Sequence, residues 1–136
     1  MTNSTAMDLE QTVAILHRHH VDVQARIQAG EYPLKGYVDT LKAMLAEFHE
    51  AGYRDAAIAV AHSGHPLTHE SGVYVRLHPV VVCDGAVYDP LFRGREALPA
   101  DAYLQRVFPH DHDEARLWGQ TTKGDYRRNL LEREAA

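Results

Sequence analysis

Apolar residues recur every three or four positions between Asp8 and Gly30, which is the period of an amphipathic helix. Asp8 followed by Gln11 is typical of a helix start, and Gly30 is typical of a helix end. We therefore predict a first helix over this range. Its apolar stripe includes one histidine and consists of Leu9, Val13, Leu16, His20, Val23 and Ile27.

A second helix is predicted from about Tyr37 to Ala51. Pro33 and Gly36 separate it from the first helix because both residues discourage a continuing helix, and Gly52 supplies the stop. The broad apolar face of this second helix is formed by Val38, Leu41, Met44, Leu45 and Phe48.

The middle of the chain changes to patterns that are typical of strands. Residues 55–61, DAAIAVA, form a short apolar run that suits a buried strand, and residues 62–72 form a loop rich in Ser, Gly and Pro. The run VYVRLHPVVV then leads into Asp84-Gly85 and AVYD. An Asp-Gly pair between such segments predicts a two-residue hairpin turn, because both positions need a positive φ. Pro79 has no N–H group, so we expect it at an edge, a bulge or a strand start.

This hairpin predicts which side chains share a face of the sheet. With Asp84 and Gly85 in the turn, the expected pairs are Cys83 with Ala86, Val82 with Val87, and Val81 with Tyr88. Because side chains alternate between faces, His78 and Asp89 become diagonal neighbours on one face, and Cys83 points to the other. A carboxylate beside an imidazole can fix its tautomer and stabilise its protonated form.

The remaining segments complete the predicted fold. Residues 98–108 predict a short third helix, residues 109–114 a polar loop, and residues 125–134 a final helix. The fold class is therefore α+β, with N-terminal helices packed on a small antiparallel sheet that contains the hairpin, and with C-terminal helices. We expect a single domain over residues 1–136, with residues 1–7 disordered; the sequence does not define how residues 115–136 dock.

The composition and charge of the chain bear on which classes of partner it can bind. The chain is 45% hydrophobic and 24% charged, as in ordinary globular proteins, and its net charge of -5 gives no basic surface for nucleic acid. No apolar run is long enough to cross a bilayer, and the first residues lack the features of a secretion signal. We therefore expect no nucleic-acid or membrane partner and a cytoplasmic location. The single cysteine, Cys83, excludes an internal disulfide within these residues.

Ten histidines are an unusual number for a chain of 136 residues. His62, His65 and His69 lie in one loop and could converge on zinc or another divalent metal, and His110 and His112 alternate with aspartates in a second candidate group. His17 and His20 are three residues apart on the first helix and could share a face. We expect no cofactor, and a divalent metal such as zinc stays open as an alternative.

The segment order resembles the core of papain-like and transglutaminase-like cysteine hydrolases. The resemblance covers roughly residues 36–92 and rests on KGYVDTLKAMLAEFHEAG for the central helix and HPVVVCDGAVYDP for the following hairpin. It implies that His78 corresponds to the family's base and Asp89 to its orienting carboxylate. The family's nucleophilic cysteine stands at the start of the central helix, but residues 36–40 read Gly, Tyr, Val, Asp and Thr, with neither cysteine nor serine.

Two other side chains are candidate nucleophiles. Cys83 is turned away from His78 by the alternation of the strand, and Thr40 lies one turn into the helix, where a packing or surface role is more common. A small buried hydrophobic residue is therefore the favoured interpretation of Cys83. A one-residue shift in the register of the hairpin would reverse the argument for Cys83.

Three interpretations of function follow, beside an ordinary structural hairpin. The favoured one is a catalytically degenerate papain-like or transglutaminase-like domain that binds a protein or peptide partner. The second is a peptide or amide hydrolase, or an acyl transferase, that uses His78 and Asp89 with an unconventional nucleophile. The third is a histidine-rich metal-binding protein.

Overall fold

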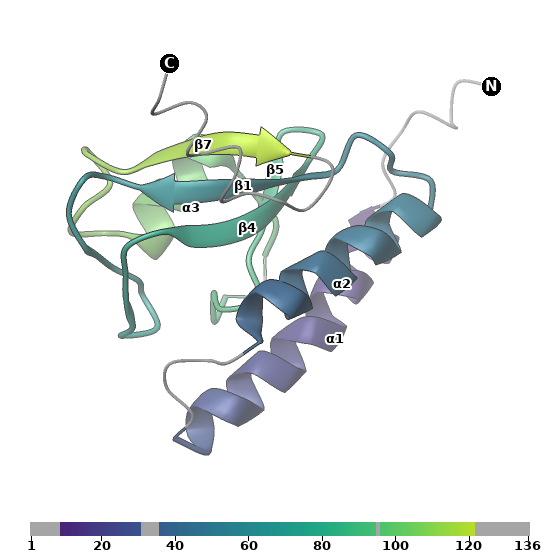
Figure 1. Cartoon of the computed structure of the whole chain (residues 1–136), viewed down its shortest axis with the longest axis horizontal. Coiled ribbons are helices and arrows are strands. Elements are labelled where there is room, and N and C mark those ends of the chain that lie inside the picture. The colour runs from purple at the N-terminus through teal and green to yellow at the C-terminus, as the bar shows by residue number, and fades with distance from the viewer. Residues whose placement is uncertain (1–8, 31–35, 95, 122–136) are drawn as a thin grey trace.

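The computed structural model describes residues 9–30, 36–94 and 96–121. Figure 1 shows a five-stranded sheet with two long helices on one side and a short helix on the other. The helices are α1 (Leu9–Gln28), α2 (Tyr37–Glu50) and α3 (Ala100–Val107). All three fall within the predicted ranges, and the predicted α+β fold is confirmed.

The large sheet has the strand order β6-β5-β4-β1-β7, with antiparallel neighbours throughout. A separate two-stranded sheet pairs β2 with β3. The strand bounds are β1 Ala57–His62, β2 Leu67–Thr68, β3 Tyr74–Val75, β4 His78–Cys83, β5 Ala86–Tyr88, β6 Leu98–Pro99 and β7 Arg116–Thr121.

Three of these strands were not predicted. β2 and β6 have two residues each, which is too short to show an alternating pattern. β7, with the sequence RLWGQT, lies in the segment whose docking the sequence left undefined, and it becomes a strand by pairing with β1. The predicted strand run over residues 73–82 contains β3 and most of β4, but it is not continuous, because residues 76 and 77 interrupt it between the two strands.

The hairpin between β4 and β5 has the predicted register. Val81 pairs with Tyr88, Val82 with Val87 and Cys83 with Ala86. Asp84 and Gly85 have φ angles of 51° and 79°, so both turn residues adopt the left-handed conformation that a two-residue hairpin requires. Pro79 is the second residue of β4, which agrees with its expected place near a strand start.

The two faces of the sheet belong to two separate hydrophobic clusters. The helices α1 and α2 cover one face, where Phe48 packs edge-on against Tyr88. The helix α3 covers the other, where Tyr103 and Val107 pack on small residues of β1 and on Val80. Alternating residues of β1 enter opposite clusters, with Ile58 and Val60 on the first face and Ala59 and Ala61 on the second. The sheet is therefore buried on both sides along β1.

No helix among the described residues is long and apolar enough to cross a membrane. The predicted helix at residues 125–134 and the expected disorder of residues 1–7 lie outside the described residues.

Replacing Gly85 tests the hairpin geometry. We expect Gly85→Val to lower the free energy of unfolding by about 1–2 kcal/mol, because a β-branched residue is strained at a positive φ. Urea denaturation would measure the loss. Gly85→Asn is the matched control, since Asn adopts this conformation readily and should cost much less. Equal losses for the two variants would contradict the turn geometry.

Candidate functional site

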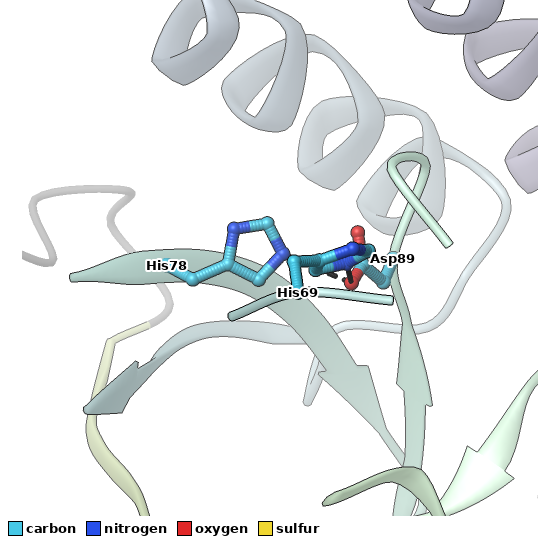
Figure 2. Close-up of side chains that lie close together, drawn as sticks. All are labelled: His69, His78 and Asp89. Atoms are coloured by element: carbon cyan, nitrogen blue, oxygen red, sulfur yellow. Dashed lines mark hydrogen bonds and ion pairs between the residues drawn. The ribbon is translucent and has the colours of Figure 1, made fainter. Parts of the chain in front are cut away.

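The carboxylate of Asp89 lies at the centre of a buried polar cluster. Asp89 follows the last residue of β5 and is 1% exposed. Its Oδ2 atom accepts three hydrogen bonds, from Nε2–H of His69 and of His78 at 2.9 Å each and from the Tyr103 hydroxyl at 2.5 Å. Figure 2 shows the two imidazoles and the carboxylate close together, with His78 on a strand. The structure therefore brings His78 and Asp89 into contact, as the hairpin register predicts.

The second carboxylate oxygen is also occupied. Oδ1 of Asp89 accepts the backbone N–H of Leu91 at 2.8 Å and the Tyr37 hydroxyl at 3.4 Å. Burial by itself raises the pKa of this carboxyl, but the electrostatic interactions and hydrogen bonds with His78 and His69 outweigh burial and hold the pKa of Asp89 well below its usual value. Asp89 is therefore an anion with donors on both oxygens.

His78, the first residue of β4, is held between rings. It is 2% exposed, and its ring lies nearly parallel to that of Tyr37, with centroids 5.8 Å apart and planes inclined by 19°. The ring of His69 meets it edge-on at 4.9 Å. Its Nε2 is engaged by Asp89, whereas its Nδ1 makes no hydrogen bond to any residue that the structure describes. Nδ1 of His78 is thus the nitrogen through which this pair could engage another group.

His69 has a tautomer that its neighbours fix. Its Nδ1 accepts the backbone N–H of Ser71 at 3.0 Å, so the ring proton resides on Nε2, which donates to Asp89. Burial lowers the pKa of His69 more than the charge of Asp89 raises it. Both observations describe a neutral imidazole that acts as a fixed donor.

Several contacts hold the loop that carries His69. The N–H of Glu70 donates to the carbonyl of Val107 at the end of α3, at 2.7 Å. Arg93 donates its backbone N–H to the Glu70 carboxylate at 2.8 Å and its guanidinium to the Glu70 carbonyl at 2.7 Å. The loops after β2 and after β5 are therefore joined directly beside the cluster.

The helix α1 holds the other side of the Asp89 loop. Nδ1 of His20 is 3.1 Å from the carbonyl of Pro90, and the amide of Gln24 donates to the carbonyl of Leu91 at 3.1 Å. The first of these contacts explains the histidine on the apolar stripe of α1, since an imidazole donor can meet a buried carbonyl there. His20 is therefore a structural residue that supports the position of Asp89.

His69, His78 and Asp89 lie close enough together to share a metal ion, with candidate ligand atoms within 4.8 Å of one another. A histidine ligand needs a free lone pair on the binding nitrogen and usually donates a proton from its other nitrogen. His69 has the reverse arrangement, because its Nδ1 faces the N–H of Ser71. Metal binding through Nε2 would require the loss of that hydrogen bond. The donor set fits a hydrogen-bonded carboxylate better than a resident metal.

The other predicted metal ligands do not join this cluster. His65 is half exposed and binds Glu114 at 2.9 Å, and His62 lies at the end of β1. His110 is exposed, and His112 contacts its neighbour Asp113 at 3.4 Å. Among the described residues, the three-residue group around Asp89 is the only set of potential ligands that converges. The structure does not bring the predicted His62, His65 and His69 together, because the loop turns His69 inward and His65 outward.

The two nucleophile candidates lie away from His78. Cys83 is 5% exposed and packs in the hydrophobic cluster under α1 and α2. Burial first, and then the charges of Asp84 and Asp55, raise the pKa of its thiol. The hydroxyl of Thr40 donates to the carbonyl of Gly36 at 3.3 Å, within its own helix. Cys83 is thus turned away from the cluster, as the strand alternation predicts.

Sequence reasoning missed three members of the cluster. The sequence places Tyr37 at the helix start without a role, gives no sign of Tyr103, and groups His69 with the other histidines of its loop. The signal for Tyr37 was its position, since the resemblance places the nucleophile there. Nothing in the local pattern around Tyr103 marks its hydroxyl, which reaches Asp89 only because α3 packs on the sheet.

Comparisons of this chain with protein-family models, curated proteins and solved structures found no match.

Replacing single members of the cluster tests its energetics. We expect Tyr103→Phe to lower the free energy of unfolding by about 1.5–3 kcal/mol, because it removes a hydrogen bond to a buried charged group. Asp89→Asn should cost more, about 3–5 kcal/mol, because it leaves donors facing an uncharged amide. Urea denaturation would measure both losses. If Asp89→Asn proved no more harmful than Tyr103→Phe, the carboxylate would not be the organising group.

The pKa of His69 predicts a loss of stability in acid. Its folded pKa lies below the ordinary value of 6.5, so the unfolded chain binds the proton first, and stability falls as the pH drops below about 6.5. We expect His69→Gln to flatten the decrease in melting temperature between about pH 7.5 and 5. His65 is the control, because its pKa is raised; His65→Gln should make the decrease steeper. A variant His69→Gln with an unchanged pH profile would contradict the neutral tautomer.

Proposed function

We propose that this chain is a catalytically degenerate relative of the papain-like and transglutaminase-like cysteine hydrolases, which works as a protein- or peptide-binding module. The observation that carries the proposal lies at the start of α2, where the family's nucleophilic cysteine would stand. There the ring of Tyr37 stacks on His78, and its hydroxyl contacts Asp89. A base and its orienting carboxylate are combined with a phenol instead of a thiol.

The arrangement of the pair supports the first half of this proposal. Asp89 accepts the Nε2 proton of His78, which leaves Nδ1 as the nitrogen that could accept a proton from a neighbouring group. A nucleophile and its base must lie within hydrogen-bond reach of each other. The side chain stacked on the His78 ring belongs to Tyr37, which carries a phenol in place of the family's thiol.

The positions of the other candidates favour binding over catalysis. An enzyme that uses the same pair needs a nucleophile, and Cys83 packs on the opposite face of the sheet with a raised thiol pKa. Thr40 is engaged by the backbone of its own helix. A hydrolase or acyl transferase with an unconventional nucleophile is thus a weaker candidate than a binding module. A metal-binding function is also weaker, because the tautomer of His69 is fixed as a donor to Asp89.

A substituted cysteine tests the assignment of position 37. In a Cys83→Ser background, we expect Tyr37→Cys to react with iodoacetamide near pH 6 at least about tenfold faster than the same variant with His78→Ala, because the imidazole takes the thiol proton. Mass spectrometry would follow the labelling. Thr40→Cys in the same background is the matched control, one turn further along α2, and its rate should not depend on His78.

The unsubstituted chain provides the second arm of the test. It should label slowly at Cys83, at a rate that His78→Ala does not change. If the labelling rate of Tyr37→Cys did not depend on His78, the assignment of position 37 would be overturned. Rapid labelling of native Cys83 that is lost in His78→Ala would instead favour a hydrolase or acyl transferase that uses Cys83 as its nucleophile.

A further inference from the structure

The turn between β2 and β3 uses the ring of His69 as one of its own hydrogen-bond acceptors. The backbone N–H of Gly72 donates to the carbonyl of His69 at 2.9 Å, which closes the turn. Inside the turn, the backbone N–H of Ser71 donates to Nδ1 of the His69 ring at 3.0 Å. The conformation of the turn therefore depends on the lone pair of Nδ1.

The hydroxyl of Ser71 is the second unusual feature of this turn. Its Oγ atom is buried and has no hydrogen-bond partner among the described residues. Most buried polar atoms of side chains are paired, so an unpaired one calls for an explanation. The hydroxyl lies within about 4 Å of the amide nitrogen of its own residue in any rotamer. An unused acceptor is therefore present in the same residue whose amide meets the His69 ring.

A proton added to His69 has one place to bind. Nε2 already carries the proton that is donated to Asp89, so a second proton binds at Nδ1. The side chain of His69 is fully buried, and bulk water does not reach this nitrogen. The new Nδ1–H and the N–H of Ser71 would then be two donors facing each other. The present turn therefore has no place for a charged His69 ring.

The surroundings of His69 act on this proton in both directions. Burial disfavours the charged ring most, and the pKa of His69 is lowered as a result. The negative charge of Asp89, at the end of β5, favours the charged ring, and that of Glu70, in the turn itself, does so weakly. The electrostatic interaction with His78, on β4, opposes it.

The other elements around His69 bring no further charge to the ring. Phe108, directly after α3, meets the ring edge-on with centroids 5.6 Å apart and has no titratable group. Tyr103 on α3 and Tyr37 on α2 both donate their hydroxyls to Asp89 and not to His69.

We propose that His69 and Ser71 form a proton-controlled switch in the turn between β2 and β3. In the form that the structure shows, the N–H of Ser71 donates to Nδ1 of a neutral ring. In acid, His69 takes up one proton from solvent at Nδ1, the turn moves the amide away, and Nδ1–H donates to Oγ of Ser71. Nε2–H continues to donate to Asp89. The charged ring then has an acceptor at each nitrogen, and the hydroxyl gains the partner that it lacks in the neutral form.

The turn is joined to the elements around the Asp89 cluster, so the switch acts beyond its own two residues. Glu70 lies between them, and its N–H donates to the carbonyl of Val107 at the end of α3. Its carboxylate accepts the N–H of Arg93, in the loop that follows Asp89. Acid therefore alters the surface beside the cluster. That this regulates a partner rests on the proposed binding function, whereas the switch itself does not.

Nitrogen NMR of the full chain, labelled with ¹⁵N and kept in EDTA, tests the switch between about pH 8 and 5. At the upper pH we expect the His69 ring as the Nε2–H tautomer, with a scalar coupling across the hydrogen bond between Nδ1 and the Ser71 amide nitrogen. In acid the ring should become an imidazolium and this coupling should vanish while the chain stays folded. His69→Gln identifies the ring signals.

Ser71→Ala isolates the hydroxyl, because it removes Oγ and keeps the backbone N–H. We expect the midpoint of the His69 titration to fall by about one pH unit or more, which corresponds to one hydrogen bond to a charged group. The free energy of unfolding at the upper pH should stay equal or rise, since the neutral form loses only an unpaired hydroxyl. Ser63→Ala is the matched control. It removes a hydroxyl that contacts the backbone of His65 in the loop before β2, and it should leave the midpoint unchanged.

Four results would refute the switch. They are a midpoint that Ser71→Ala leaves unchanged, an equal shift in Ser63→Ala, a Ser71 coupling that persists on the charged ring, and unfolding of the chain before His69 takes up its proton. None of these measurements involves position 37. Failure of the switch and failure of the Tyr37→Cys labelling are therefore distinguishable.

Discussion

The buried negative charge of Asp89 is the constraint that organises this fold. Removing a carboxylate from water costs several kcal/mol unless donors replace the water. Here the donors come from α2, β4, α3, the loop after β2 and the backbone after Asp89 itself. Each element must take its place for the charge to be satisfied. The cluster therefore links both faces of the sheet, which otherwise belong to separate hydrophobic clusters.

The direction of the hydrogen bonds around the Asp89 carboxylate also determines which neighbouring groups keep their protons. Ser71 donates to His69, and His69 therefore donates to Asp89 as a neutral imidazole. Burial and the negative charge of Asp89 raise the pKa of Tyr103 well above its usual value, so its hydroxyl keeps its proton. With these fixed donors in place, His78 is the member of the cluster with a ring nitrogen that no described residue engages. The support around the His78–Asp89 pair is thus as complete as an active site needs, whereas the start of α2 presents Tyr37.

Local sequence patterns predict the contact between His78 and Asp89, but not the other members of the cluster or β7. The Asp84-Gly85 turn fixes the register of its hairpin, and register alone brings His78 to Asp89. His69 and Tyr103 also donate hydrogen bonds to Asp89, but they are 20 and 14 positions away from it in the sequence. Tertiary packing brings them together, and no short sequence pattern predicts it. β7 shows the same limit, because RLWGQT becomes a strand only beside β1. The resemblance to cysteine hydrolases singles out position 37, although no sequence pattern predicts that Tyr37 stacks on His78.

The short helix α3 depends on the cluster for its position. Its inner face presents Tyr103 to Asp89, and the N–H of Glu70 binds the carbonyl of Val107 at its last residue. Its flank borders two surface hollows, one at Ala100 and the other at Leu104. A helix of eight residues that is held at both its centre and its end has little freedom to move separately from the cluster. The hydrogen bonds of Asp89 therefore hold α3 in place, so the buried carboxylate also fixes the part of the surface that this helix forms.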